Sequence, residues 1–82
     1  MINAILIDDE PAARASLTLD IKLHCPEIRI MAEAGSVIEA IHTIEAHPRA
    51  DLLFLDIQLT DGSGFDILQN VDCSHCKVIF TT

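Results

Sequence analysis

Short apolar runs alternate along this chain with longer stretches whose apolar residues recur at helical spacing. A strand that is covered on both faces needs such a run, whereas a helix that covers a sheet needs apolar residues on one side only. The predicted strands are residues 4–7, 28–33, 51–56 and 77–82. The connections are too short for anything but right-handed crossovers, which predicts a parallel sheet. The expected fold class is therefore α/β, an open, doubly wound parallel sheet.

The first predicted helix has a clear start and a clear end. Pro11 suits the first helical turn, where its missing N–H costs nothing, and the helix should end before Pro26, at Cys25. Arg14, Asp20 and Lys22 are expected to turn away from its apolar face. The residues expected on that apolar face are Ala13, Leu17, Ile21 and His24.

The second and third predicted helices follow polar loops. Ser36 and Glu39 have the spacing of a capping box, which predicts a helix that starts at Ser36 and ends at residues 47–48. Its buried stripe should be Val37, Ile41 and Ile44. A glycine-containing turn at residues 61–64 should then lead into a short helix that carries Phe65, Ile67 and Leu68.

Charge limits the classes of partner. The chain carries 5 Lys and Arg against 13 Asp and Glu, a net charge of −8, so it should repel phosphate backbones and not bind nucleic acid directly. The chain has no run of basic residues that would favour binding to an anionic membrane. The N-terminus has neither a signal peptide nor a long apolar segment, which predicts a cytoplasmic location with reduced thiols at Cys25, Cys73 and Cys76.

Three acids follow two of the predicted strands. Asp8 and Asp9 come directly after the first strand, and Asp56 ends the third. If these strands are neighbours, the three carboxylates meet at one edge of the sheet, where ligands bind in this fold class. Their mutual repulsion favours a hard cation such as Mg²⁺, beside which a carboxylate could act as a nucleophile toward a phosphoryl group. A hydroxyl from Thr81 or Thr82 would then contact that group. The alternative for Asp8, Asp9 and Glu10 is ordinary capping of the following helix and compensation of its dipole.

These residues resemble a known family. Residues 5–11, residues 53–59 with Gly64 after them, and residues 78–82 are similar to the receiver domain of bacterial two-component response regulators, and the resemblance covers the whole chain. It implies a CheY-like sheet with strand order 2-1-3-4. It also implies that Asp56 accepts a phosphoryl group from a sensor histidine kinase, as a signalling switch and not as a turnover enzyme.

The resemblance further assigns roles around Asp56. Asp9 and Asp56 would bind Mg²⁺ directly together with the backbone carbonyl of Gln58, Asp8 would act mainly through water, and Thr82 would be the switch hydroxyl. The residues of the Asp56 loop and of segment 80–82 are most similar to those of receivers attached to LytTR-type DNA-binding domains. This implies that transcription is regulated by a further C-terminal domain.

Two departures from the family pattern stand out. Thr60 occupies the position where the family usually has proline. The family's fifth strand, which carries a lysine that contacts the phosphoryl group, and its last two helices have no counterpart in residues 1–82. We therefore expect these residues to be the N-terminal part of a receiver domain, incomplete at its C-terminal end. An uncovered fourth strand would then favour association, for example as a homodimer.

Other signals are weaker. Cys73 and Cys76 have C-x-x-C spacing, but a zinc site needs about four ligands and the chain has no second pair. His24, His42 and His47 are expected at the surface or at its boundary. Two further functions stay open: a pseudo-receiver that binds a partner without phosphorylation, and an aspartate-nucleophile phosphohydrolase, for which Gln58 stands where the acid–base aspartate is needed.

Overall fold

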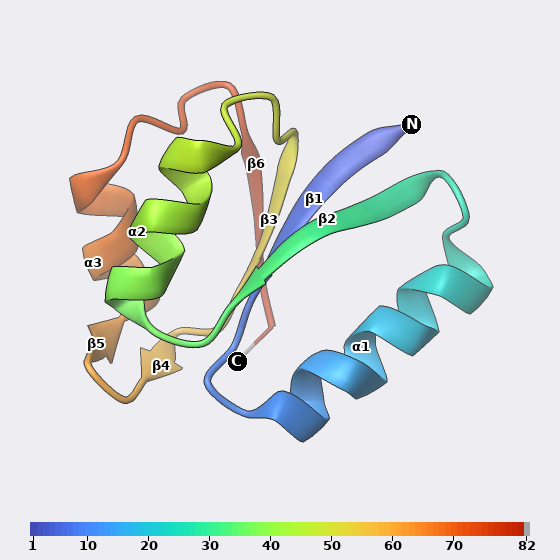
Figure 1. Ribbon diagram of the computed structural model, residues 1–82, viewed down its shortest axis with the longest axis horizontal. Coiled ribbons are helices and arrows are strands. Elements are labelled where there is room, and N and C mark those ends of the chain that lie inside the picture. The colour runs from blue at the N-terminus through green and yellow to red at the C-terminus, as the bar shows by residue number, and fades with distance from the viewer. Residues whose placement is uncertain (82) are drawn as a thin grey trace.

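The computed structural model describes residues 1–81, in which strands and helices alternate. β1 (Ile2–Ile7), β2 (Ile28–Ala34), β3 (Leu52–Leu55) and β6 (Lys77–Phe80) pair in parallel, in the order β2-β1-β3-β6 (Figure 1). The predicted doubly wound α/β class and strand order 2-1-3-4 are thus confirmed, with β6 as the fourth predicted strand.

Helices cover both faces of this sheet. α1 (Pro11–His24) lies on one face, and α2 (Val37–Ala46) and α3 (Gly64–Asn70) lie together on the other (Figure 1). Within residues 1–81, none of the helices has the length and apolarity needed to cross a membrane.

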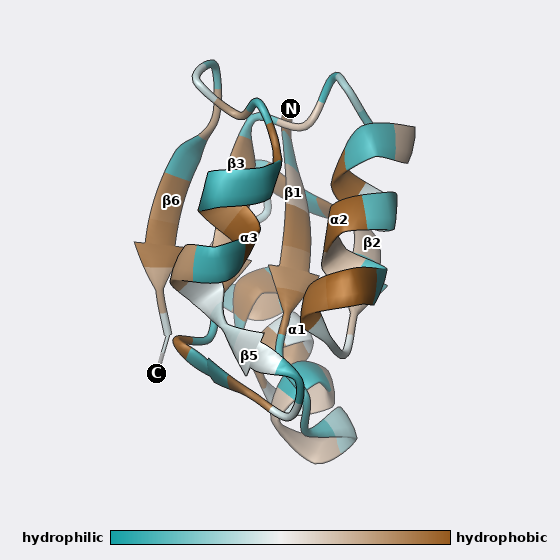
Figure 2. Ribbon diagram, turned by 90° about the vertical axis from the view of Figure 1, so that its left-hand side faces the viewer, coloured by the Kyte–Doolittle hydropathy of each residue, from teal (hydrophilic) through white to brown (hydrophobic). Residues whose placement is uncertain are grey.

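Alternating side chains of β1 and β3 divide the core into two parts. Ile5, Ile7, Leu53 and Leu55 are fully buried against α2 and α3. The residues between them point to the face of α1, where they pack with Ile21; these are Ala4, Leu6, Leu52 and Phe54. Figure 2 shows the apolar colour of these central strands. The centre of the sheet is therefore buried on both faces, as the continuous apolar runs of β1 and β3 require.

The helix boundaries follow the predicted signals. The Ser36 hydroxyl accepts a hydrogen bond from the Glu39 N–H at 3.0 Å, and the Glu39 carboxylate accepts one from the Gly35 N–H. α1 begins at Pro11, and the N–H of Cys25 closes its last turn on the Ile21 carbonyl. The capping signals therefore set the start of α2 and the end of α1 as expected.

Two details differ from the sequence prediction. β4 (Gln58–Leu59) and β5 (Gly62–Ser63) form a small antiparallel hairpin where only a turn was predicted, because strands this short have no recognisable alternation. His24, predicted on the apolar face of α1, is exposed. Contact between α1 and the sheet ends one turn earlier, at Ile21.

β6 lies at the edge of the described sheet. Its side chains Ile79 and Phe80 are 47% and 42% exposed, in contrast to the buried residues of β3 beside them. The Phe80 ring lies 5.4 Å from that of the exposed Phe65 on α3, measured between centroids. An apolar edge strand of this kind is the exposed edge that the sequence predicts.

Candidate metal centre

The register of the parallel strands brings the acidic residues together. Ile7 of β1 is the partner of Leu55 of β3, and the N–H of Asp56 donates to the Ile7 carbonyl at 3.0 Å. Asp8 directly follows Ile7 and Asp56 directly follows Leu55, so both leave the sheet at the same level. The predicted meeting of the first and third strands is confirmed.

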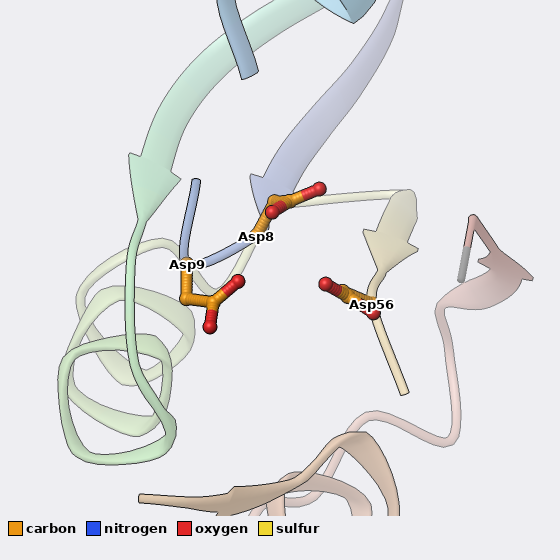
Figure 3. Close-up of side chains that lie close together, drawn as sticks. All are labelled: Asp8, Asp9 and Asp56. Carbon is orange, nitrogen blue, oxygen red and sulfur yellow. The ribbon is translucent and has the colours of Figure 1, made fainter. Parts of the chain in front are cut away.

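Asp8, Asp9 and Asp56 form one half-buried cluster. Each offers a carboxylate oxygen that lies within 4.8 Å of those of the other two. Figure 3 shows the carboxylates of Asp9 and Asp56 pointing toward each other, with Asp8 beside them. Mg²⁺ binds oxygen at about 2.0–2.1 Å, so two ligands on opposite sides of one ion are about 4.2 Å apart. The cluster therefore has the donor type and the size that fit one hard divalent cation.

Local hydrogen bonds fix two of these carboxylates. Asp8 Oδ1 accepts from the N–H of Glu10 at 2.9 Å, and Asp56 Oδ1 accepts from the N–H of Gln58 at 3.1 Å. The residue before α1 is Glu10, and its side chain makes no capping hydrogen bond in the described part of the chain. The bond of Asp8 also stops short of the helix, so helix capping does not account for these acids.

Gly64 allows the loop after Asp56 to close tightly. A Cβ at this position would lie 2.7 Å from the Asp56 carbonyl oxygen and 3.0 Å from Leu55 Cγ. The N–H of Gly64 donates to the Ile57 carbonyl at 2.8 Å. Only a residue without a side chain lets α3 begin directly against the backbone of Asp56.

The structure describes only some of the residues that were predicted to supply a hydroxyl or a carbonyl to the site. Thr82 lies outside the described residues, so its switch role stays a prediction. Thr81, the alternative, follows Phe80, the partner of Leu55, and lines an open pocket of about 350 Å³ with Asp8 and Asp56. Its buried hydroxyl has no hydrogen-bond partner among residues 1–81. Gln58 is in place beside Asp56 through its N–H, while a metal bond from its carbonyl stays a prediction.

Arg14 is a residue of this region that sequence reasoning missed. We expected it to turn away from the apolar face of α1, but it is half-buried and donates to the Asp8 carbonyl and to Glu33. Its position, one turn into the helix that follows Asp8 and Asp9, was the available signal. The sequence does not show that β2 brings Glu33 to the same place.

The remaining candidates stay apart from this cluster. In the described residues, the acidic cluster is the one group of His, Cys, Asp or Glu side chains arranged to hold a metal, so Cys73 and Cys76 find no further ligand. Burial raises the pKa of both thiols, and Cys76 Sγ donates to the Ala50 carbonyl at 3.1 Å. His42 is exposed and His47 is half-buried, as predicted, and the exposure of His24 agrees with its expected surface position and not with the helical spacing that put it on the apolar face of α1.

The sequence is similar to that of known regulators. The profile of the response regulator receiver domain matches residues 4–82. Sensory transduction protein LytT of Enterococcus faecalis is 43% identical over 76 residues, which cover 93% of this chain and 30% of LytT. Transcriptional regulatory protein BtsR of Escherichia coli is 35% identical over 83 residues, covering 100% of this chain and 34% of BtsR. The chain thus spans about a third of the length of these relatives.

Solved structures agree on the fold. A chain from the complex of the CheA3 P1 domain with CheY6 of R. sphaeroides superimposes with a TM-score of 0.81 at 26% identity, over 96% of this chain and 61% of that one. The response regulator domain of CheB from Thermotoga maritima gives a TM-score of 0.84 at 21% identity, over 98% of this chain and 59% of that one.

Proposed function

The chain belongs to the response regulator receiver domain family, and from this premise we propose that Asp56 accepts a phosphoryl group from a sensor histidine kinase. The observation that carries the proposal is the convergence of Asp8, Asp9 and Asp56 within 4.8 Å at the carboxyl ends of β1 and β3. Three carboxylates so close together repel one another, and a bound cation relieves that repulsion. The protein is a signalling switch that carries the phosphoryl group, not an enzyme that turns over a substrate.

The geometry of Asp56 supports this transfer chemistry. Its Oδ1 accepts the N–H of Gln58, which leaves Oδ2 as the attacking atom. A new O–P bond forms as the P–N bond to the kinase imidazole breaks, and the bonding electron pair stays on the imidazole nitrogen. Asp8, Asp9, Asp56 and the Gln58 carbonyl would hold Mg²⁺, which offsets charge on the transferring oxygens when bound.

Signal output and partner are inferred from relatives. A histidine kinase phosphotransfer domain is the proposed partner, in line with the CheA3 P1 and CheY6 complex. Thr82 is the proposed hydroxyl that contacts the phosphoryl group. BtsR is a transcriptional regulatory protein, and we place this chain in the same role, with DNA binding by a LytTR-type domain outside it. The cytoplasmic location predicted from the sequence belongs to this proposal.

The test is intact-mass spectrometry after treatment with acetyl phosphate and Mg²⁺. The chain should gain the mass of one phosphoryl group, and the gain should disappear in Asp56→Asn and when EDTA replaces Mg²⁺. Asp51→Asn is the matched control, because Asp51 lies just before the N-terminal end of β3, at the other end of the strand from Asp56. Its carboxylate accepts a hydrogen bond from the N–H of Asn3. This variant should keep the adduct.

The alternatives give different results in the same assay. Steady release of phosphate without an adduct would indicate a phosphohydrolase, although Gln58 offers no acid–base group. Absence of both adduct and turnover would indicate an interaction module that is not phosphorylated. Either result overturns the proposed phosphoacceptor.

A further inference from the structure

The guanidinium of Arg14 joins three separate parts of the fold beside the acidic cluster. From α1, its Nη1 donates to the backbone carbonyl of Asp8 in the loop after β1. Its Nε donates to Glu33 Oε1 of β2 at 3.2 Å, which is also the ion pair found within residues 1–81. The two bonds use different nitrogens of one planar group, so a single side chain fixes the loop against the strand.

The peptide units around Asp8 are thereby held on both sides. The N–H of Asp8 donates to the Ala34 carbonyl of β2 at 3.1 Å, and its carbonyl accepts from Arg14. The Asp8 carbonyl belongs to the peptide that joins Asp8 to Asp9. Its direction therefore sets where the Asp9 side chain leaves the backbone.

Gly35 leaves room for this arrangement. A Cβ at position 35 would lie 3.1 Å from Arg14 Nη1, closer than most side chains tolerate. The N–H of Gly35 is held by the Glu39 carboxylate at the start of α2, so the backbone there is not free to move away. A Cβ at residue 35 would therefore press against the guanidinium of Arg14.

We propose that Arg14 is a positioning residue, which holds the peptide between Asp8 and Asp9 so that the Asp9 carboxylate faces Asp56. This inference rests on the proposed metal site for its functional consequence, while its geometric part stands alone. The charge of Arg14 and its positioning role predict opposite changes in Mg²⁺ affinity when Arg14 is replaced. A cation near the cluster repels Mg²⁺, so electrostatics alone predicts tighter Mg²⁺ binding when Arg14 is neutralised. Positioning predicts weaker binding.

Mg²⁺ affinity measured by isothermal titration calorimetry decides between these signs. Arg14→Gln should weaken binding by about tenfold, in the range typical for groups that orient metal ligands. Arg14→Lys should restore little of the affinity, because one ammonium cannot replace the two-pronged donor. Arg49→Gln is the control for charge and should leave the affinity unchanged, since Arg49 is exposed in the loop before β3.

Gly35→Ala gives a second test without any change of charge. Its Cβ should displace the guanidinium and weaken Mg²⁺ binding, and the Arg14→Gln/Gly35→Ala double variant should be no weaker than Arg14→Gln alone. Additive losses would overturn the proposal, as would Arg14→Gln binding Mg²⁺ as tightly as the original protein. Circular dichroism confirms that each variant is folded.

Amide hydrogen exchange tests the positioning role of Arg14 independently of the proposed metal site. Without Mg²⁺, the Asp8 amide should exchange faster in Arg14→Gln than in Arg49→Gln, because its bond to Ala34 loses the support of the guanidinium. If the original protein binds no Mg²⁺, the proposed metal site fails while this comparison still decides the role of Arg14. Equal exchange rates in the two variants would contradict positioning.

Discussion

At the scale of single residues, Asp8 and Asp9 adjoin in sequence but differ in their constraints. One oxygen of Asp8 is engaged by the N–H of Glu10 at 2.9 Å, and its backbone is bonded to Ala34 and Arg14. The carboxylate of Asp9 points toward Asp56 (Figure 3). We therefore propose that Asp9 and Asp56 share the cation directly, with Asp8 in a supporting position.

This difference gives a prediction for two neighbouring variants. Asp9→Asn should weaken Mg²⁺ binding by about tenfold or more, and Asp8→Asn should weaken it less, because a ligand that acts through water contributes less than a direct one. Calorimetric titration of both variants measures the ranking. A larger loss for Asp8→Asn would reverse the assignment of direct and indirect ligands.

Gly64 supports a second prediction at this scale. Gly64→Ala should lower the free energy of unfolding by about 1–3 kcal/mol, because its Cβ would meet the Asp56 carbonyl oxygen at 2.7 Å and backbone cannot yield as a flexible side chain does. Urea unfolding measures this. Gly35→Ala is the comparison, since its nearest neighbour is the end of a side chain and not backbone, Arg14 Nη1 at 3.1 Å, and its loss should be smaller. An equal or larger loss would contradict this account.

At the scale of elements, the β4–β5 hairpin is joined to the start of α2. The Asp61 carboxylate accepts from the N–H groups of Val37 and Ile38, at 2.7 and 3.2 Å. The Val37 N–H is the main cause that lowers the pKa of Asp61, and the Ile38 N–H acts in the same direction. The loop that follows Asp56 therefore caps a helix from 24 residues away, on the face opposite α1.

This cap makes stability depend on pH. A carboxyl whose pKa is lowered by folding stabilises the protein above its unfolded pKa of about 3.9, and that stabilisation is lost as the pH falls through the folded value. Asp61→Asn should therefore reduce the free energy of unfolding at pH 7, and the difference from the original protein should vanish as the pH falls through the folded pKa of Asp61. Urea unfolding of both proteins, at pH 7 and at a pH below the folded pKa of Asp61, measures this difference in the free energy of unfolding.

Glu45→Gln is the control for the Asp61 prediction. It removes the same charge near the C-terminal end of α2, where a negative charge is unfavourable for the helix dipole, so it should not reproduce the loss. A pH-independent difference for Asp61→Asn would contradict the capping role.

At the scale of the whole molecule, the features that could be predicted from the sequence are those that depend on local residue patterns. The apolar runs of β1 and β3 and the capping signals at Ser36 and Pro11 located the sheet and helices, and with them Asp8, Asp9 and Asp56. Contacts between distant segments could not be predicted this way. Arg14 meets Glu33 and Asp61 caps α2 only because the fold brings separate elements together.

The exposed edge of the sheet gives a prediction for the molecule as a whole. Unpaired backbone groups on an apolar edge strand favour pairing with another chain, so we expect association that increases with concentration in sedimentation velocity. Ile79→Lys on β6 should reduce it, since Ile79 is 47% exposed. Leu23→Lys is the control, at a 65% exposed position on α1, and should leave it unchanged. A monomer at all concentrations would contradict the prediction.

The most direct measurement for the central claim is the chemical location of the phosphoryl group. Borohydride reduces an aspartyl phosphate to homoserine, which tandem mass spectrometry can place in a peptide. After treatment with acetyl phosphate and Mg²⁺, homoserine should appear at residue 56 and not at residues 8 or 9, because Asp56 is the proposed nucleophile and the other two acids support the cation. Homoserine at Asp8 or Asp9, or at no aspartate, would contradict the account.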